Sequence, residues 1–391
     1  MNKLKIFDIS DTCTGCGACV NVCPKHCLRL EPDNEGFYMP KYQDGCIECG
    51  MCEKVCHVIH SNEKKPISEE SVIIYHSSDS DIREKSSSGG AFSLFADYVI
   101  KNEGVVFATL YNPETKRVEV SSTDSFPVQR FRKSKYAESF SGDTCSQIRR
   151  ELQNGRTILF CGTPCQVSGL KRFLETSKVD MTKLLTIDFI CHGVPSMKCL
   201  NAFLSYDGRE VVDMDFRYKD FSDKKIGWHD MAYCEYYASG ESRVLTCNDL
   251  HYYYYYYPFL ESIMLRKSCY TCKEVSFSSA DITVGDFWSI YKDKSIADDN
   301  KGVSIIKFHT PKAINIWSEL NIDGYHREIS FDIIQSQLTN KTSGLQKERT
   351  VFFAEVGKKG YMPTVRRRYI RKFIQYKLMK YGSRIKRLFL R

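Results

Sequence analysis

Two runs of four cysteines near the N-terminus constrain this chain more than any other feature. The runs are Cys13-x2-Cys16-x2-Cys19-x3-Cys23, followed by Pro24, and Cys46-x2-Cys49-x2-Cys52-x3-Cys56. This spacing is typical of bacterial ferredoxins with two 4Fe-4S clusters, in which the fourth cysteine of each run binds the cluster of the other run. The repeat therefore predicts an α+β ferredoxin-like domain over residues 1–60, built by internal duplication.

Crosswise ligation divides the eight thiolates into two sets of four. The first set is Cys13, Cys16, Cys19 and Cys56, and the second is Cys46, Cys49, Cys52 and Cys23. Three thiolates on one tight loop can hold three irons of a cube, while the fourth iron takes a thiolate from the other repeat. A zinc site is the alternative, but zinc ribbons use two CxxC pairs. Cys27 falls outside the pattern and is expected to be a packed thiol.

Cysteine usage and charge indicate the cellular setting. Nine of the 18 cysteines lie in the first 56 residues, and clustered cysteines in a reducing compartment indicate metal ligands before disulfides. Residues 1–10 lack a signal-peptide core and no run of 18 apolar residues occurs, so we expect a cytoplasmic protein. The net charge of +8 is due to eleven Lys and Arg within residues 366–391. A nearly neutral body argues against nucleic acid as a partner.

The rest of the chain begins with a polar linker over residues 61–70 and then alternates strands with helices. Amphipathic stretches at 91–102 and 143–154 separate short β-branched runs, which predicts an α/β domain with a mixed sheet over residues 71–350. The runs are VIIYHSS, GVVFATL, RTILFCG and KLLTIDFI. Residues 211–257 are rich in aromatics and predict antiparallel strands that depart from this alternation, as an antiparallel excursion. Within them, Tyr252–Tyr257 fit a strand or a helix.

Residues 351–391 are predicted to form a basic C-terminal tail, with an amphipathic helix from Arg366. Its apolar positions recur every three or four residues: Ile370, Phe373, Ile374, Leu378, Tyr381, Ile385 and Leu388. Such a helix can lie on the anionic inner face of a membrane, dock on a partner, or pack on its own body. The pattern leaves these alternatives open.

Two loops of the body carry residues suited to phosphate. Ser86–Phe92, with the sequence SSSGGAF, precedes a predicted helix, and small residues there permit close approach of an anion to the helix N-terminus. Serine is also an ordinary N-cap. Residues 130–136 (RFRKSKY) concentrate cations where a diphosphate could sit, and a solvated basic loop is the alternative.

Cysteines follow two of the predicted strands. Cys161 and Cys165 come after one strand, and Cys191 comes after another. The carboxyl ends of parallel strands are where open α/β sheets bind ligands. Cys269-x2-Cys272 adds a two-thiolate clamp further along the chain.

Six motifs in the body resemble one known family. In chain order they are SSGGAF, SKYAES, GTPCQVSGL, CHGVPS, LRKSCYTC and DITVGDFW. Over roughly residues 70–310 this ordered set is similar to the coenzyme F420 hydrogenase/dehydrogenase beta-subunit family, whose members are also seen fused to a two-cluster ferredoxin domain. The resemblance implies FAD, a third 4Fe-4S cluster and two-electron chemistry. Archaeal members use the deazaflavin F420, and bacterial members of this fused type often accompany surface-polysaccharide synthesis.

The resemblance implies roles for particular residues of this chain. The third cluster would be bound by Cys165, Cys191, Cys269 and Cys272, with Cys161 as a rival to Cys165. FAD would lie on Ser87, Ser88, Gly89 and Gly90, with Lys133, Ser134 and Lys135 near its phosphates. His192 and Asp286 are the candidates for catalysis, although a structural role for the histidine is an equal alternative.

The sequence as a whole predicts an FAD- and iron–sulfur-dependent oxidoreductase. Its partners would be a redox carrier or partner oxidoreductase and a small organic substrate, with no nucleic acid. The alternative is a non-catalytic electron-transfer subunit of a larger redox complex. A zinc scaffold without redox function is a third reading.

Overall fold

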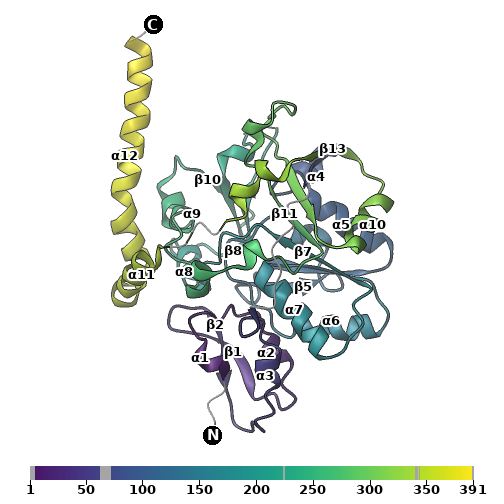
Figure 1. Ribbon diagram of the computed structural model, residues 1–391. Coiled ribbons are helices and arrows are strands. Elements are labelled where there is room, and N and C mark those ends of the chain that lie inside the picture. Colours follow the sequence, from purple (N-terminus) through teal and green to yellow (C-terminus); the bar gives the residue numbers. More distant parts are fainter. Residues whose placement is uncertain (1–4, 62–71, 223–224, 340–341, 343, 390–391) are drawn as a thin grey trace.

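The computed structural model describes residues 5–61, 72–222, 225–339, 342 and 344–389, with the side chains of residue 275 and residues 381–389 left aside. Nearly all of the predicted linker at 61–70 lies outside these ranges. The chain forms an N-terminal ferredoxin module over residues 5–61 and a larger body, with a long C-terminal helix along one side (Figure 1).

The ferredoxin module is a small α+β unit with very short elements. Its strands β1 and β2 pair antiparallel, and three one-turn helices flank the cysteine loops. The elements are α1 (Lys5–Asp8), α2 (Ala18–Asn21), β1 (Leu28–Pro32), β2 (Tyr38–Tyr42) and α3 (Met51–Lys54). Glycines with positive φ precede α2 and α3, so each helix starts inside a cysteine run. The module therefore consists largely of loops wrapped around its cysteines.

The body is built on an eight-stranded mixed sheet, as the alternation of strands and helices predicted. In spatial order the strands are β13 (Gly324–Ile329), β3 (Val72–Ser77), β12 (Ser304–Phe308), β11 (Ile282–Asp286), β7 (Leu184–Phe189), β6 (Ile158–Cys161), β4 (Val105–Asn112) and β5 (Arg117–Ser122). The four strands β4, β6, β7 and β11 run parallel. Their carboxyl ends therefore meet at one edge of the sheet, where Cys165 follows β6 and Cys191 follows β7.

Helices cover both faces of this sheet. On one face, α6 (Thr144–Gln153) and α7 (Pro164–Thr176) pack against side chains such as Phe107 and Phe160. On the other, α5 (Ala91–Lys101) and α10 (Pro311–Glu319) pack against neighbours such as Val106 and Leu159. Strand residues alternate between the two faces, and both faces are apolar because both are covered. The predicted helices at 91–102 and 143–154 are confirmed as α5 and α6.

The antiparallel excursion predicted at 211–257 is also confirmed. Strands β8 (Val211–Tyr218), β9 (Ala232–Tyr237) and β10 (Ser242–Leu245) form a three-stranded antiparallel sheet. The run of tyrosines that follows is helical, in the 3-10 turn η4 (Leu250–Tyr254) and in α9 (Tyr256–Leu260). Together with α8 (Met197–Leu204), these segments enclose the largest apolar core.

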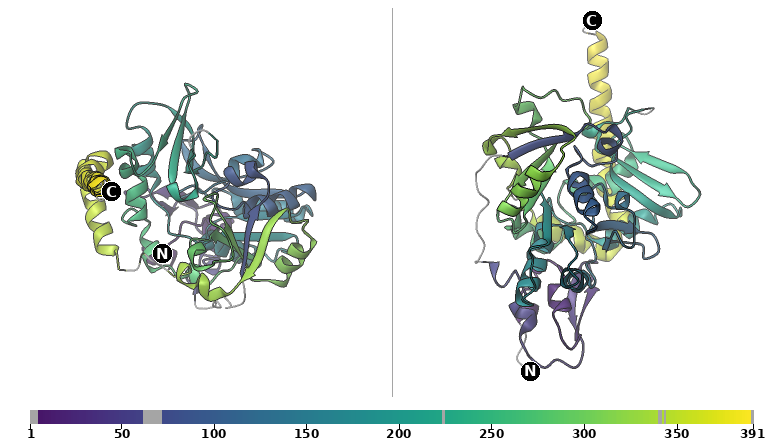
Figure 2. Two further views of the ribbon diagram at one scale, coloured as in Figure 1. Left: turned by 90° about the horizontal axis from the view of Figure 1, so that it is seen from above. Right: turned by 90° about the vertical axis from the view of Figure 1, so that its right-hand side faces the viewer.

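Two C-terminal helices follow the body. Helix α11 (Gln346–Lys359) crosses residue 350, where the sequence placed the boundary between body and tail. It buries Phe352 and Phe353 in the largest core. Helix α12 (Tyr361–Phe389) starts before Arg366, and its first turns bury Val365 and Tyr369, whereas its later turns project past the body (Figures 1 and 2). Within the described part of the chain, none of the helices has the length and apolarity needed to span a bilayer.

Candidate iron–sulfur sites

The first set of predicted ligands meets where the ferredoxin module contacts the body. Cys13, Cys16, Cys19 and Cys56 line one cavity. Burial, followed by the neighbouring thiolate of Cys19, raises the pKa of the Cys16 thiol. Gly169 of α7 lies directly against this site, because a Cβ there would come 2.7 Å from Cys16 Sγ. We call these four cysteines the proximal site.

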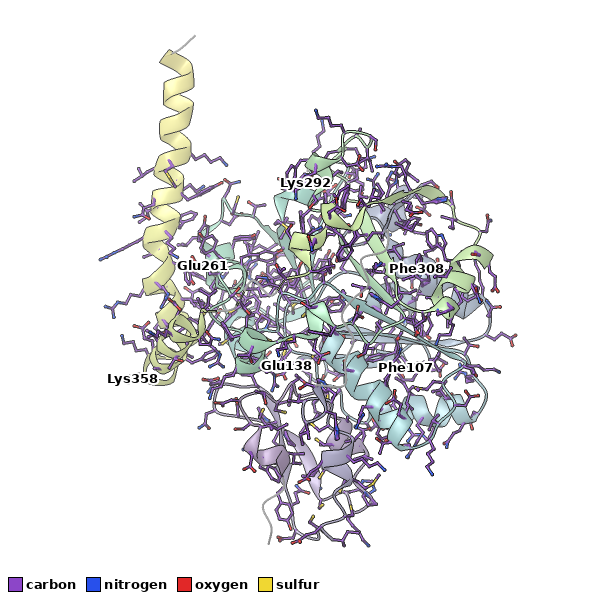
Figure 3. All side chains as sticks on the ribbon, viewed as in Figure 1. Phe107, Glu138, Glu261, Lys292, Phe308 and Lys358 are labelled. Carbon is purple, nitrogen blue, oxygen red and sulfur yellow. The ribbon has the colours of Figure 1, made fainter. Side chains whose placement is uncertain are left out.

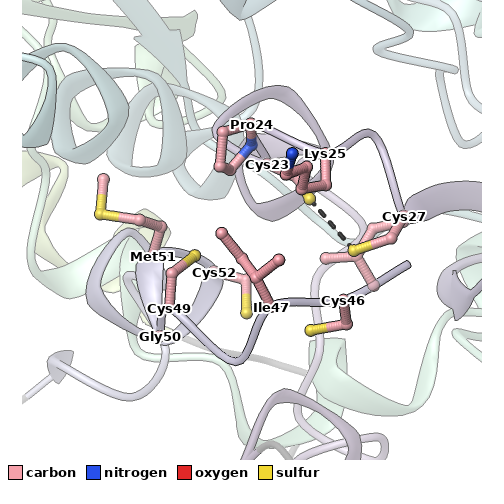
Figure 4. Close-up of a pocket in the computed structure, with 11 residues that line it drawn as sticks. Cys23, Pro24, Lys25, Cys27, Cys46, Ile47, Cys49, Gly50, Met51 and Cys52 are labelled. Carbon is pink, nitrogen blue, oxygen red and sulfur yellow. Dashed lines mark hydrogen bonds between the residues drawn. The ribbon is translucent and has the colours of Figure 1, made fainter. Parts of the chain in front are cut away.

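The second set lies toward the free end of the module. Cys23, Cys46, Cys49 and Cys52 line a second cavity (Figure 4) and form what we call the distal site. Cys49 is exposed to solvent. Cys27 is buried, as expected of a packed thiol, but it lines the same cavity with its Sγ 3.3 Å from Cys23 Sγ. The two sets thus separate as crosswise ligation requires.

A third group of cysteines converges from three segments of the body. Cys165 opens α7, Cys191 follows β7, and Cys269 and Cys272 lie in and after the 3-10 turn η5 (Lys267–Thr271). Burial and then Cys272 raise the pKa of Cys165 to about 12. Burial and then Cys269, Cys165 and Cys272 raise the pKa of Cys191. Gly193 lies between two of these cysteines, since its N–H donates to Cys191 Sγ at 3.4 Å and a Cβ on it would lie 3.4 Å from Cys269 Sγ. We call the four cysteines the third site.

Cys161, the rival to Cys165, lies in a different environment. It ends β6 and packs against the core under α5, where burial and then Asp188 raise the pKa of its thiol to about 12. The structure therefore groups Cys165, not Cys161, with Cys191, Cys269 and Cys272.

The described residues contain no group of three or more His, Cys, Asp or Glu side chains arranged around a single metal ion. That arrangement is what a mononuclear zinc site needs. Thiolates of a 4Fe-4S cluster bind four separate irons and surround a larger volume, and the cavities lined by the proximal and distal cysteines fit this donor set.

A chain of polar contacts joins the proximal and third sites. His57, next to Cys56, has its Nε2 3.0 Å from Thr14 Oγ1 and its Nδ1 3.1 Å from Glu274 Oε1. Ser168 Oγ donates to the other oxygen of Glu274 at 2.8 Å. Nothing local to His57 in the sequence could have revealed a partner more than 200 residues away.

The two loops predicted to hold FAD do meet. Ser134 N donates to Ser87 Oγ at 2.7 Å, and the two hydroxyl oxygens lie 3.0 Å apart. Ser88 and Gly89 are engaged within the protein, since Ser88 Oγ donates to Val303 O and Gly89 N donates to Ser304 Oγ. Gly89 also packs on β3, because a Cβ would lie 2.2 Å from Tyr75 O. Gly90 caps α5 with a φ of +102°.

The lysines of the second loop are bound to protein oxygens, whereas the sequence expected them beside phosphates. Lys133 Nζ donates to Asp215 Oδ2 at 2.7 Å, and the ammonium group of Lys135 donates to the carbonyls of Arg130, Arg132 and Lys133. Burial lowers the pKa of Lys135 to about 8. These contacts fix the shape of the loop, which local cation density in the sequence could not show.

The two candidates for catalysis belong to different networks. His192 Nε2 lies 2.8 Å from Ser262 Oγ. Asp286 ends β11, where its carboxylate accepts from Arg217 Nη1 at 3.0 Å and from Trp228 Nε1 at 2.8 Å. Arg217 also stacks over Trp288, 5.0 Å from the ring centroid. Asp286 thus helps to orient a buried arginine at the carboxyl edge of the sheet, which the DITVGDFW motif alone did not indicate.

The fold and these sites define the class of protein: an iron–sulfur protein in which a ferredoxin module is joined to a mixed α/β body. Residues 12–59 match the family model described as a 4Fe-4S dicluster domain. Residues 155–332 match the model described as the C terminus of the coenzyme F420 hydrogenase/dehydrogenase beta subunit. The resemblance predicted from the six motifs is therefore confirmed, and the chain contains one region similar to each of these two models.

Two individual proteins illustrate the similarity. One component of the F(420)H(2) dehydrogenase of Methanosarcina mazei is 24% identical over 297 residues, which cover 70% of this chain and 75% of that protein. A chain in the structure of the F420-reducing [NiFe] hydrogenase complex from Methanosarcina barkeri is 16% identical, with a TM-score of 0.45. The alignment covers 74% of this chain and 93% of that one.

Proposed function

We propose that the chain is an iron–sulfur electron-transfer subunit of an oxidoreductase complex, with two clusters in its ferredoxin module and a third in its body. The observation that carries the proposal is the convergence of Cys165, Cys191, Cys269 and Cys272 beside the proximal site. Helix α7 contacts both, since it begins with Cys165 and packs Gly169 against Cys16. The similar protein of Methanosarcina mazei is itself named as one part of a dehydrogenase, which supports the proposal.

The positions of the three sites support one order of electron transfer. The distal site includes the exposed Cys49 and is open to an external redox carrier or partner subunit. The proximal site lies between the distal site and the body, next to the third site. Electrons would therefore pass between the distal and third sites through the proximal cysteines, in either direction.

A flavin beyond the third site is part of the proposal. Where the two loops meet, a phosphate could bind to Ser87, to Ser134 and to the N-terminus of α5. A bound flavin would supply the exchange between one-electron and two-electron chemistry. His192 and Asp286 would hold or orient polar groups near it. With such a centre the chain could itself oxidise or reduce an organic substrate, including an intermediate of surface-polysaccharide synthesis.

Cofactor analysis of the anaerobically purified chain tests the proposal. We expect about twelve iron and twelve sulfide per chain, as three 4Fe-4S clusters require. Cys165→Ser should remove about four of each, whereas Cys161→Ser, on the same loop, should remove none. About eight iron in the wild type and no change in Cys165→Ser would refute a cluster at the third site.

Flavin content and turnover separate the two forms of the proposal. Stoichiometric flavin together with substrate turnover by the isolated chain would support an enzyme. Reduction of the clusters without turnover, until a partner subunit is added, would support a non-catalytic subunit.

The middle of α12 has the features of a helix that contacts an anionic membrane. Ile370, Ile374 and Leu378 recur every four residues and are 41–66% exposed, among basic residues such as Arg371 and Lys377. Such a helix can lie in the interface of an acidic bilayer. We expect salt-sensitive sedimentation with phosphatidylserine vesicles, reduced in an Ile374→Gln/Leu378→Gln variant. Equal sedimentation of variant and wild type would refute this contact. Truncation at Pro363 is a poor test because it removes the buried Val365 and Tyr369.

A further inference from the structure

A buried ion pair lies at the boundary between the ferredoxin module and the body. Arg266 and Glu138 form this pair, and their side chains are only 4% and 5% exposed. Figure 3 shows Glu138 at this boundary. Both residues belong to the body. The other hydrogen bonds of their side chains reach into the module, so the pair couples the two parts of the chain.

Hydrogen bonds tie the pair to the loop of the proximal site. Arg266 Nη1 donates to Cys13 O at 3.1 Å, and Nη2 donates to Tyr38 O at 2.7 Å. Tyr38 N donates to Glu138 Oε2 at 3.0 Å. Gly15, with a φ of +70°, permits this approach, since a Cβ there would lie 2.6 Å from Arg266 Nη2. The guanidinium is therefore fixed against the backbone that carries Cys13 and Cys16.

The same arginine lies beside the third site. Its own backbone N–H donates to Val194 O at 3.0 Å, three residues after Cys191, and Cys269 N donates back to Arg266 O at 3.0 Å. Arg266 is also the N-cap residue of the turn η5, which carries Cys269. One positive charge thus lies beside segments of both sites in a buried position, where charges interact strongly.

We propose that Arg266, balanced by Glu138, raises the reduction potentials of the proximal and third clusters relative to that of the distal cluster. This inference rests on the proposed function, because it requires both clusters. Transfer of one electron makes the receiving cluster more negative by one charge, and no bond or proton need change. A fixed positive charge stabilises the reduced state and raises the potential of a nearby cluster.

A second ion pair, with a buried arginine and a partly exposed carboxylate, provides a control. Arg349, 4% exposed, pairs with Glu35 of the module, and its Nε donates to Leu265 O at 2.7 Å. Its guanidinium stacks on the ring of Phe353, 4.4 Å from the centroid. This pair also joins the module to the body, but the side-chain hydrogen bonds of Arg349 go to Leu265 O and Glu35 and not to the loop that carries Cys13. A purely mechanical role for Arg266 would therefore be shared by Arg349.

Redox titration of the full-length chain, followed by electron paramagnetic resonance, tests the inference. Arg266→Gln should shift the potentials of the proximal and third clusters to more negative values, and Glu138→Gln should shift both to more positive values. Arg266→Lys, which keeps the charge, should restore the wild-type values. The distal cluster should move least in all three variants, and Arg349→Gln should leave all three potentials in place.

Shifts of the same sign in Arg266→Gln and Glu138→Gln, or equal shifts in Arg266→Gln and Arg349→Gln, would overturn the inference. If Arg266→Gln does not fold, the potentials of the other two variants still test the inference. Arg266→Lys keeps the positive charge, and Glu138→Gln removes the negative one. Wild-type protein with only two clusters would overturn the proposed function and this inference together. Three clusters with unmoved potentials in the variants would overturn the inference alone.

Discussion

Among the described residues, the ferredoxin module buries only Ile6, Leu28 and Cys52 in an apolar cluster of its own, whereas the body packs four much larger clusters around its sheets. One of those three residues is itself a predicted ligand. Units of this size rarely bury enough apolar surface to fold without a metal or another staple. The comparison indicates that the module depends on its clusters, while the body is held by side-chain packing.

Docking on the body supplies part of what the module lacks. Ala18 and Val55 are buried in the body cluster under α6 and α7, and Phe37 is buried in the largest core. These contacts fall on the side of the proximal site. The distal side, with the exposed Ile47 and Cys49, lacks comparable cover among the described residues. Dependence on iron should therefore increase from the proximal to the distal end of the module.

Removal of iron should produce the largest difference between the module and the body. Chelation under reducing conditions should abolish amide protection across residues 5–61, because metal binding there is coupled to folding. Strands β6 and β7 should keep their protection, since both of their faces are buried. Hydrogen exchange followed by mass spectrometry measures both regions in one sample. Loss of protection in β6 and β7 as well would show that the body also depends on iron.

Single ligand substitutions sharpen the comparison within the module. Cys49→Ser and Cys19→Ser should each remove about four iron, one cluster's content. Cys19→Ser should also lower the melting temperature more, because Cys19 packs against both the module core and the body core, whereas Cys49 is exposed. Iron analysis and calorimetry of the two variants test this. Equal melting temperatures would show that the proximal site, which lies against the body, and the exposed distal site contribute equally to stability.

A core substitution in the body should affect stability without affecting iron. Phe95 of α5 is fully buried between the helix and the sheet, so Phe95→Ala should cost about 3–5 kcal/mol of unfolding free energy. Ile100→Ala, on the exposed face of the same helix, should change it by about 0.5 kcal/mol. Denaturant titration gives these values. Iron per folded chain should match the wild type in both variants, and a deficit in Phe95→Ala would link the body core to cluster assembly.

The sequence predicted those features that depend on local spacing. The two cysteine sets follow from ligand intervals, and the parallel strands follow from short apolar runs between helices. The pair Arg266–Glu138 and the contact His57–Glu274 could not be predicted, because each joins segments more than 100 residues apart that only docking brings together. Arg266 lies in the motif LRKSCYTC and Glu138 in SKYAES, so the motifs contained both residues without indicating their contact.

Periodicity and composition were also insufficient to assign partners. The apolar positions of α12 divide between a row on the body, which includes Tyr369 and Phe373, and an exposed row with Ile374 and Leu378. The spacing cannot distinguish them, since both rows repeat at helical intervals. Likewise the cationic loop at 130–136 gave no sign that Lys133 pairs with Asp215, 82 residues away.

The pH dependence of stability should be a property of the body. Burial raises the pKa of Asp188 to about 7, while Ser278 Oγ and Thr283 Oγ1 donate to its oxygens. An unfolded Asp has a pKa of about 3.9, so between pH 4 and 7 the folded chain retains a proton that the unfolded chain has released. Stability from this group is thus fully present in acid and is lost as pH rises to about 7.

Replacing the carboxyl with an amide tests that assignment. Asp188→Asn stays neutral, so its stability relative to the wild type should rise from pH 4 to 7, by about 1.4 kcal/mol for each unit of pKa difference. Asp180→Asn should show the opposite sign, at values below about pH 4, because the backbone N–H of Thr182 lowers the pKa of that exposed carboxyl. Chemical denaturation at a series of pH values gives both curves. Parallel curves for Asp188→Asn and the wild type would contradict the assignment, and an iron content that followed the same curve would place the pH dependence in the module instead.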